Sequence, residues 1–176
     1  GATPARIRMP HRNSHGQYDN GAKTSLPWMS IGYETQVPPI STLTFYNTIA
    51  NNGKMMRPRF VSKVMKNGET IMEFPPEVMR QQIAKERSIK ELQTILEQVV
   101  SVGLGKKAGS PNFKVAGKTG TAQISKGAGG YKSGGTSYLI SFAGYFPADA
   151  PRYSCIVCIQ KSGLPASGGT MCGKVF

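Results

Sequence analysis

The sequence predicts an α+β fold in which helices cover an antiparallel sheet on both faces, an α/β/α sandwich-like arrangement. Two helix-like segments and a β-hairpin come first, and three strand-like segments follow. Short connections between the strand-like segments favour antiparallel pairing. The second of these segments is apolar on both faces, with Tyr138 and Phe142 on one and Leu139 and Ala143 on the other. Such a sheet needs a cover on each side.

The N-terminal quarter of the chain is expected to be mostly irregular. Residues 1–39 have little hydrophobic periodicity and many turn formers. A helix is expected from Pro39 onward, because Leu43, Tyr46 and Ile49 share one helical face. The pair Asn52-Gly53 supplies its stop.

A β-hairpin and a second helix are expected next. Residues 60–65 and 70–74 are β-rich and flank Asn67-Gly68, a favoured two-residue hairpin turn. The second helix is predicted to begin at a capping box, Ser88-Ile-Lys-Glu91, and to end at Gly103. Apolar residues at helical spacing follow the box.

Three strands are expected in the rest of the chain, over residues 113–124, 136–146 and 152–161, with a glycine-rich loop after the first. Two helices are too few to cover both faces of such a sheet. We therefore expect residues 1–176 to form a partial domain, the C-terminal portion of a larger one.

Composition excludes several classes of function. The chain has 176 residues and a formal net charge of +13. Its cations are scattered without a run of five, so binding to nucleic acid is not expected. Only Asp19 and Asp149 supply aspartate carboxylates, which argues against a dicarboxylate hydrolase or a carboxylate metal site. The apolar runs are too short for a transmembrane helix.

No metal and no cofactor is expected from the cysteines and histidines. Cys155 and Cys158 have the spacing of a redox or zinc motif, but they fall in a predicted strand, where residues i and i+3 point to opposite faces. We interpret both as buried structural cysteines. His11 and His15 lack a third ligand nearby in the sequence.

The motif that carries chemistry is Ala116-Gly-Lys-Thr-Gly-Thr-Ala-Gln123. A phosphate-binding P-loop would need a glycine at position 112, which is Asn112, and its lysine would have to open a helix. Here the motif continues as a strand. The alternative is the K-T-G strand of penicillin-recognising acyl-transferases. In that reading Lys118 places a positive charge beside the reacting centre, and Gly120 lets substrate approach closely.

The remaining chemistry of a K-T-G strand is also available in this motif. The hydroxyls of Thr119 and Thr121 can bind a substrate carboxylate, and the Thr121 N–H is a candidate oxyanion-hole donor. An edge strand also lets a peptide substrate lie along it by backbone pairing.

Further blocks, in matching order and spacing, make the chain resemble the C-terminal half of the transpeptidase domain of class B penicillin-binding proteins, and the cell-division type most. These blocks are Ser30–Ser41, Tyr46–Gly53, Arg57–Phe60, Val99–Ala108, Ser141–Pro147 and Gly168–Phe176. The resemblance implies the penicillin-binding transpeptidase, β-lactamase-like fold, here incomplete.

The resemblance also implies roles for particular residues. The residues expected in the catalytic site are Lys118, Thr119 and Gly120. Those expected to bind substrate are Thr121, Gln123 and Tyr131. The family often carries an aromatic pair before the final Gly-Gly, where this chain has Ala166-Ser167. Tyr131, on the glycine-rich loop, is expected to substitute for that pair in part.

The family's nucleophile, the serine of an S-x-x-K motif, is not found in this sequence. No serine here has a lysine three residues later. Ser110-Pro-Asn112 fits the family's second motif, S-x-N, but it lies on the loop that enters the K-T-G strand, so we interpret it as a turn. We expect the nucleophile to lie before Gly1 and this chain alone to be inactive.

The resemblance implies a serine D,D-transpeptidase that cross-links peptidoglycan stem peptides ending in D-Ala-D-Ala and is acylated by β-lactams. It also implies division-machinery partners and an extracytoplasmic domain anchored in the cytoplasmic membrane. An elongation-type enzyme, a serine β-lactamase and a non-catalytic β-lactam sensor remain alternatives. An incomplete sheet would also favour self-association of the chain.

Overall fold

The computed structural model describes residues 25–33, 35–124 and 136–176, and the chain forms two compact units, residues 1–42 and 43–176. In the first unit, α1 (Ser25–Ser30) is followed by a turn in which the rings of Trp28 and Tyr33 meet edge to face, 5.3 Å apart. The prediction that residues 1–39 are irregular is therefore wrong for α1. A six-residue helix has too few turns to show a hydrophobic period.

The helix α2 (Pro39–Ala50) agrees with the prediction in both its start and its stop. Asn52 and Gly53 adopt left-handed φ angles of 53° and 94°, which end the helix. The amide of Gln93 on the next helix donates a hydrogen bond of 2.8 Å to the Ile49 carbonyl. One carbonyl in the last turn of α2 thus finds a partner from another helix.

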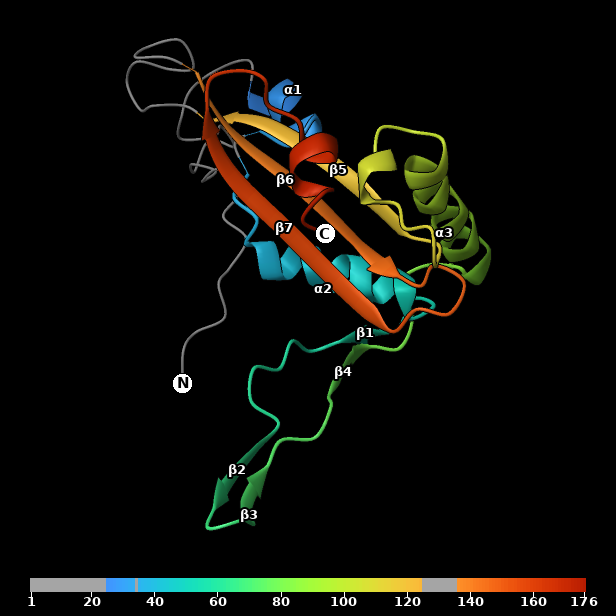
Figure 1. The fold of residues 1–176 in the computed structure, drawn as a ribbon. Helices are drawn as coiled ribbons and strands as arrows, with labels where there is room; N and C mark the ends of the chain where they lie inside the picture. Colours follow the sequence, from blue (N-terminus) through green and yellow to red (C-terminus); the bar gives the residue numbers. More distant parts are fainter. Residues whose placement is uncertain (1–24, 34, 125–135) are drawn as a thin grey trace, which may run out of the picture. The chain divides into compact units, whose positions relative to one another are not determined.

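A hairpin follows α2 as predicted. Its strands β2 (Lys63–Lys66) and β3 (Glu69–Glu73) are joined by Asn67 and Gly68 at φ 51° and 85°, the positive angles that a type I′ turn requires. Its base is a short antiparallel pair, β1 (Met55–Met56) with β4 (Val78–Arg80). Figure 1 shows the hairpin projecting beyond the central sheet of its unit. We call residues 57–80 the arm, and every residue of β2 and β3 in it is exposed.

The helix α3 (Glu86–Ser101) is present, but the predicted capping box is wrong. The helix begins before Ser88, and its N-cap, Lys85, makes no side-chain capping bond. Glu91 is held at 2.8 Å by Arg87, one turn earlier. Ion pairs at this spacing favour a helical first turn, and the burial of Ile89, 1% exposed, draws that turn onto the core.

The central sheet has three antiparallel strands in the order β5-β6-β7, as predicted. They are β5 (Ala116–Ile124), β6 (Ser137–Phe146) and β7 (Tyr153–Ser162). Within the described residues, β5 pairs only with β6 and forms one edge of the sheet. β5 begins later than the predicted residue 113, because the ring of Phe113 stacks on Phe146 at 5.5 Å instead of joining the ladder.

One face of the sheet, which we call the η3 face, is covered by the C-terminal helical turn η3 (Gly168–Cys172). Figure 1 shows this turn lying over the strands. The fully buried side chains of Ile140 and Phe142 pack here with Val100 of α3 and with Cys172. Because strand residues alternate, Thr119 and Thr121 of β5, which pair with Phe142 and Ile140, belong to the same face.

The opposite face, the α2 face, is covered only in part. Near one end, Ala116 and Tyr145 pack with Ile49 of α2 and Leu96 of α3. Toward the other end the side chains are exposed, and the Leu139 side chain remains 45% exposed. The open half of the α2 face consists of Lys118, Ala122, Leu139, Cys158 and Gln160. The sequence predicted such a surface, because two helices are too few to cover both faces of the sheet.

The cysteines differ in part from the prediction. Cys155 and Cys158 alternate across β7 as expected, since their partners on β6 are Gly144 and Ser141. Cys158 is exposed, however, and Cys155 is only partly buried, so the assignment of both as buried structural cysteines is wrong. Cys158 lies on the open half of the α2 face, where no helix of the described residues covers it. Cys172 is buried.

The hydroxyl of Tyr145 is buried without a hydrogen-bond partner within the described part of the chain. Burial, with a smaller contribution from the Glu97 charge, raises the pKa of Tyr145 to about 12. The unfolded chain ionises this phenol near pH 10. Between these two values the native state retains a proton that the unfolded state loses, so stability falls as pH rises.

We therefore expect Tyr145→Phe to leave the unfolding free energy at neutral pH unchanged or raised by up to ~1 kcal/mol. The variant should also lose less stability than the wild type between pH 10 and 12. Urea titrations of the chain at several pH values measure both effects. Tyr153→Phe, at an exposed tyrosine, serves as the control. A loss of more than ~1 kcal/mol at neutral pH would show that the Tyr145 hydroxyl has a partner.

Candidate functional site

The K-T-G-T sequence lies in the edge strand β5. Lys118 is the third residue of the strand, which begins at Ala116 and continues without a break to Ile124. A P-loop lysine would instead stand at the start of a helix. The structure therefore excludes the P-loop alternative.

Lys118 and Thr119 meet at the strand edge although their side chains start on opposite faces. Lys118 is exposed, and its Nζ donates hydrogen bonds to the Thr119 carbonyl at 2.9 Å and to Thr119 Oγ1 at 3.4 Å. The long lysine side chain thus bends around the edge of β5. A cation and a hydroxyl group lie side by side there, next to the unpaired edge.

Gly120 lies in close contact with the neighbouring strand and with η3. A Cβ on Gly120 would lie 2.5 Å from Ser141 Oγ on the neighbouring strand. On the opposite side, Gly168 of η3 is so close to the Gly120 backbone that a Cβ on Gly168 would overlap with it. A side chain on Gly120 would have to displace the Ser141 hydroxyl, whereas the backbone contact excludes a side chain on Gly168.

Thr121 is bound to a segment that the site prediction did not include. The backbone N–H of Gly168 donates a hydrogen bond of 3.3 Å to Thr121 Oγ1. The next glycine, Gly169, also borders the site, because a Cβ there would lie 3.1 Å from Thr119 Cγ2. Gln123 is exposed further along β5. Tyr131 and the other residues of the glycine-rich loop, 125–135, lie outside the described residues.

Comparison with known proteins places this strand in a family. The family model described as penicillin binding protein transpeptidase domain matches residues 10–176. The chain belongs to this family. The match covers the K-T-G strand together with the η3 segment that contacts it, and the observed fold agrees with it.

Named relatives of this penicillin-binding protein transpeptidase domain come from bacteria and an alga. Penicillin-binding protein PbpB of Mycolicibacterium smegmatis is 32% identical over 161 residues, a match covering 86% of this chain and 24% of the relative. The peptidoglycan D,D-transpeptidase FtsI homolog of Mesostigma viride is 27% identical over 153 residues, covering 80% of this chain and 25% of the relative. The chain thus spans about a quarter of these relatives.

A solved structure gives the same result. The transpeptidase domain of the FtsI4 D,D-transpeptidase from Legionella pneumophila aligns with a TM-score of 0.59 and 27% sequence identity. The alignment covers 95% of this chain and 54% of that chain. The predicted fold class, an antiparallel sheet with helices on its faces, is confirmed for this penicillin-binding protein transpeptidase domain.

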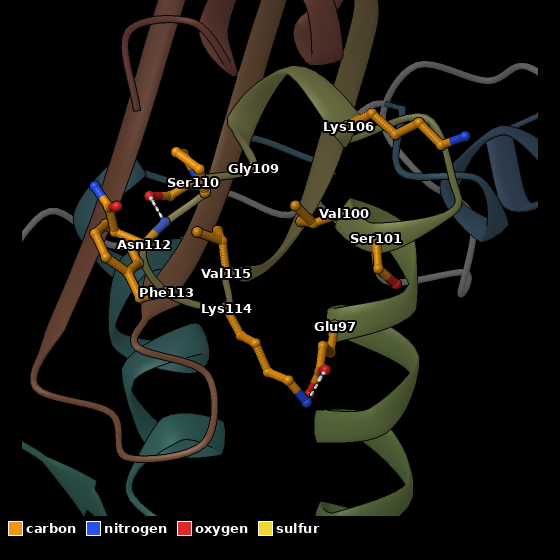
Figure 2. A pocket seen from close by; sticks show the side chains of 11 residues that line it. Glu97, Val100, Ser101, Lys106, Gly109, Ser110, Asn112, Phe113, Lys114 and Val115 are labelled. Carbon is orange, nitrogen blue, oxygen red and sulfur yellow. Dashed lines mark hydrogen bonds and ion pairs between the residues drawn. The ribbon is translucent and has the colours of Figure 1, made fainter.

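A pocket of about 670 Å³ in this transpeptidase domain lies away from the K-T-G residues, between α3 and the loop that enters β5. Figure 2 shows Lys114 and Glu97 joined across it, with their ion pair at 2.8 Å. The Glu97 carboxylate raises the pKa of Lys114 through a hydrogen bond and its charge. Ser110 Oγ accepts a hydrogen bond of 3.2 Å from the Asn112 N–H, so the S-x-N match forms a local turn, as interpreted.

The structure describes residues 25–33, 35–124 and 136–176, and these contain neither a metal-binding cluster nor a membrane-spanning helix. Over those ranges, no three metal-binding side chains come together. None of the helices in the same ranges combines the length and the apolar character needed to cross a membrane.

Proposed function

We propose that the chain is the C-terminal portion of a serine D,D-transpeptidase that cross-links peptidoglycan stem peptides in cell division and is acylated by penicillin. The observation that carries the proposal is the exposed Lys118 ammonium beside the Thr119 hydroxyl, on a strand edge that pairs with no other strand of the described residues. The names of two relatives, both D,D-transpeptidases, support the reaction class.

The proposed reaction begins with a stem peptide lying along the edge of β5. A serine hydroxyl attacks the carbonyl between the two terminal D-alanines, and its proton passes to the departing D-Ala nitrogen. The acyl group then passes from serine to an amine of a second strand, which restores the hydroxyl. Lys118 and the hydroxyls of Thr119 and Thr121 hold the terminal carboxylate, and the Thr121 N–H contributes to the oxyanion hole.

The proposed nucleophile would approach the open half of the α2 face. Lys118 starts from this face, and Leu139 and Cys158 are exposed further along the same face. A sheet face that carries both exposed apolar side chains and a cationic group suits burial against another part of the same domain. We propose that this part carries the S-x-x-K serine, and that the parent protein acts outside a cytoplasmic membrane to which it is anchored.

Because the proposed S-x-x-K serine lies outside the 176-residue chain, the chain and its parent should differ in their labelling by penicillin. Incubation with a fluorescent penicillin, followed by denaturing electrophoresis, should label the parent at one serine and leave the chain unlabelled. The reason is that no serine of the chain precedes a lysine by three residues. A labelled serine within residues 1–176 would contradict this placement of the serine, and an unlabelled parent would contradict the proposed function.

A further inference from the structure

Ser167 forms a cap on the C-terminal segment that touches the K-T-G strand. Its backbone is extended, with φ −146° and ψ 115°, and it precedes η3 as the N-cap residue. Its Oγ accepts a hydrogen bond of 3.2 Å from the Thr170 N–H, and its carbonyl accepts one of 2.9 Å from the Met171 N–H. These bonds fix the orientation of the next peptide unit, which carries the Gly168 N–H.

The Gly168 N–H limits which hydrogen bonds the Thr121 hydroxyl can still form with a substrate. A hydroxyl has one proton to donate and two lone pairs that accept. Gly168 donates to Thr121 Oγ1 at 3.3 Å, so one lone pair is occupied from the η3 side. Thr121 is exposed, so its own proton is available on the open side of the strand for an incoming acceptor.

Close packing keeps this arrangement in place. Gly168 and Gly169 are both buried, and neither has space for a side chain. A Cβ on Gly168 would overlap with the carbonyls of Gly120 and Ser141, and a Cβ on Gly169 would overlap with the Leu104 carbonyl. The segment therefore sits directly on the K-T-G strand, and a change in its cap is transmitted to Thr121.

We infer that Ser167 is a positioning residue, which holds the Gly168 amide against Thr121 and so presents the Thr121 hydroxyl proton to the carboxylate of a bound substrate or penicillin. That a carboxylate binds to Thr121 rests on the proposed function. The contact between Gly168 and Thr121 rests on the structure alone. Ser167 stands where aromatic residues were expected from the family resemblance, so the role belongs to this chain's own sequence.

The test uses the complete parent protein and two probes that differ only in the carboxylate, benzylpenicillin and its methyl ester. Ser167→Ala should lower the second-order rate of acylation by benzylpenicillin about tenfold, the effect of weakening one charge-assisted hydrogen bond. The rate with the methyl ester should change less than about twofold. Ser167→Thr, which keeps the capping oxygen, should restore the rate with benzylpenicillin.

Thr121→Val should show the same selective loss, and adding Ser167→Ala to it should have no further effect, because both act through one contact. Ser110→Ala removes a comparable side-chain acceptor from an exposed turn and should change neither rate. Equal losses with both probes would mean that Ser167 acts on stability alone and would overturn the inference.

A second measurement separates this inference from the proposed function. Hydrogen exchange of the Gly168 amide, measured by NMR in glycine-labelled parent protein, needs no acylation. Exchange should be about tenfold faster in Ser167→Ala and in Thr121→Val than in the wild type. Unchanged exchange would overturn the positioning role. A parent that no penicillin acylates would instead overturn the proposed function, and the exchange rates would still decide the role of Ser167.

Discussion

Replacing Lys118 by glutamine in the complete parent protein is expected to lower the rate of acylation by penicillin about 100- to 1,000-fold. Glutamine keeps most of the side-chain length but removes the ammonium charge, which in our proposal stabilises both the bound carboxylate and the reacting centre. Rapid-quench labelling with a fluorescent penicillin measures the rate. Lys118 is exposed in the chain, so the substitution should leave the fold intact.

Lys161→Gln is the matched control for this experiment. Lys161 also lies on a strand of the central sheet, and its Nζ donates to the neighbouring Ser162 carbonyl at 3.2 Å, as Lys118 does to Thr119. Because Lys161 is on β7, with β6 between it and the K-T-G strand and out of register with Lys118, its substitution should change the rate less than about twofold. An equal loss in both variants would mean that overall charge, and not the position of Lys118, controls acylation.

Phe142→Ala is expected to lower the unfolding free energy of the chain by ~3–5 kcal/mol. Phe142 is fully buried at the centre of the η3 face, and its ring meets Phe176 edge to face at 4.7 Å. Its ring also lies against the Gly117 backbone, where a Cβ would be only 2.6 Å away. Removal of the ring therefore leaves a cavity that neither neighbour can fill without moving the strands.

Urea-induced unfolding followed by circular dichroism measures this loss, and Phe60→Ala provides the comparison. Phe60 is 85% exposed in the arm, so its truncation should change the unfolding free energy by less than ~0.5 kcal/mol. Similar losses for the two phenylalanines would show that the arm is packed against the core in solution. A loss below ~1 kcal/mol for Phe142→Ala would contradict the assignment of the central cluster.

Local patterns predicted the elements whose residues interact mainly with near neighbours in sequence. Asn67-Gly68 dictates a tight turn through its own backbone preferences, and the hairpin appeared where this pair indicated. The three strands of the central sheet were predicted over residues 113–124, 136–146 and 152–161, and the first of them begins later, at Ala116. The prediction that α3 begins at a capping box at Ser88 was wrong. Burial of Ile89 and the ion pairs of the first turns let the helix begin earlier, at Glu86.

The parts of the site contributed by distant residues were not predictable in the same way. Lys118, Thr119 and Gly120 are visible as a motif because they are consecutive. The partners of Gly120 and Thr121, namely Ser141 and Gly168, are separated from them by tens of residues, and no spacing rule connects them. One feature of the sequence could have indicated the role of Ser167. It is a residue type that caps helices, it stands three positions before Thr170, and it occupies a place where aromatic residues were expected.

The exposed arm has a practical consequence for work on this protein. Residues 57–80 lie between α2 and α3, the arm has one short antiparallel pair, β1 with β4, at its base, and the turn at Asn67-Gly68 lies at the far tip. Chain inserted at such a tip disturbs no buried side chain. A fluorescent reporter or an affinity peptide could be placed there, so that the parent protein is followed in cells while both of its termini remain native.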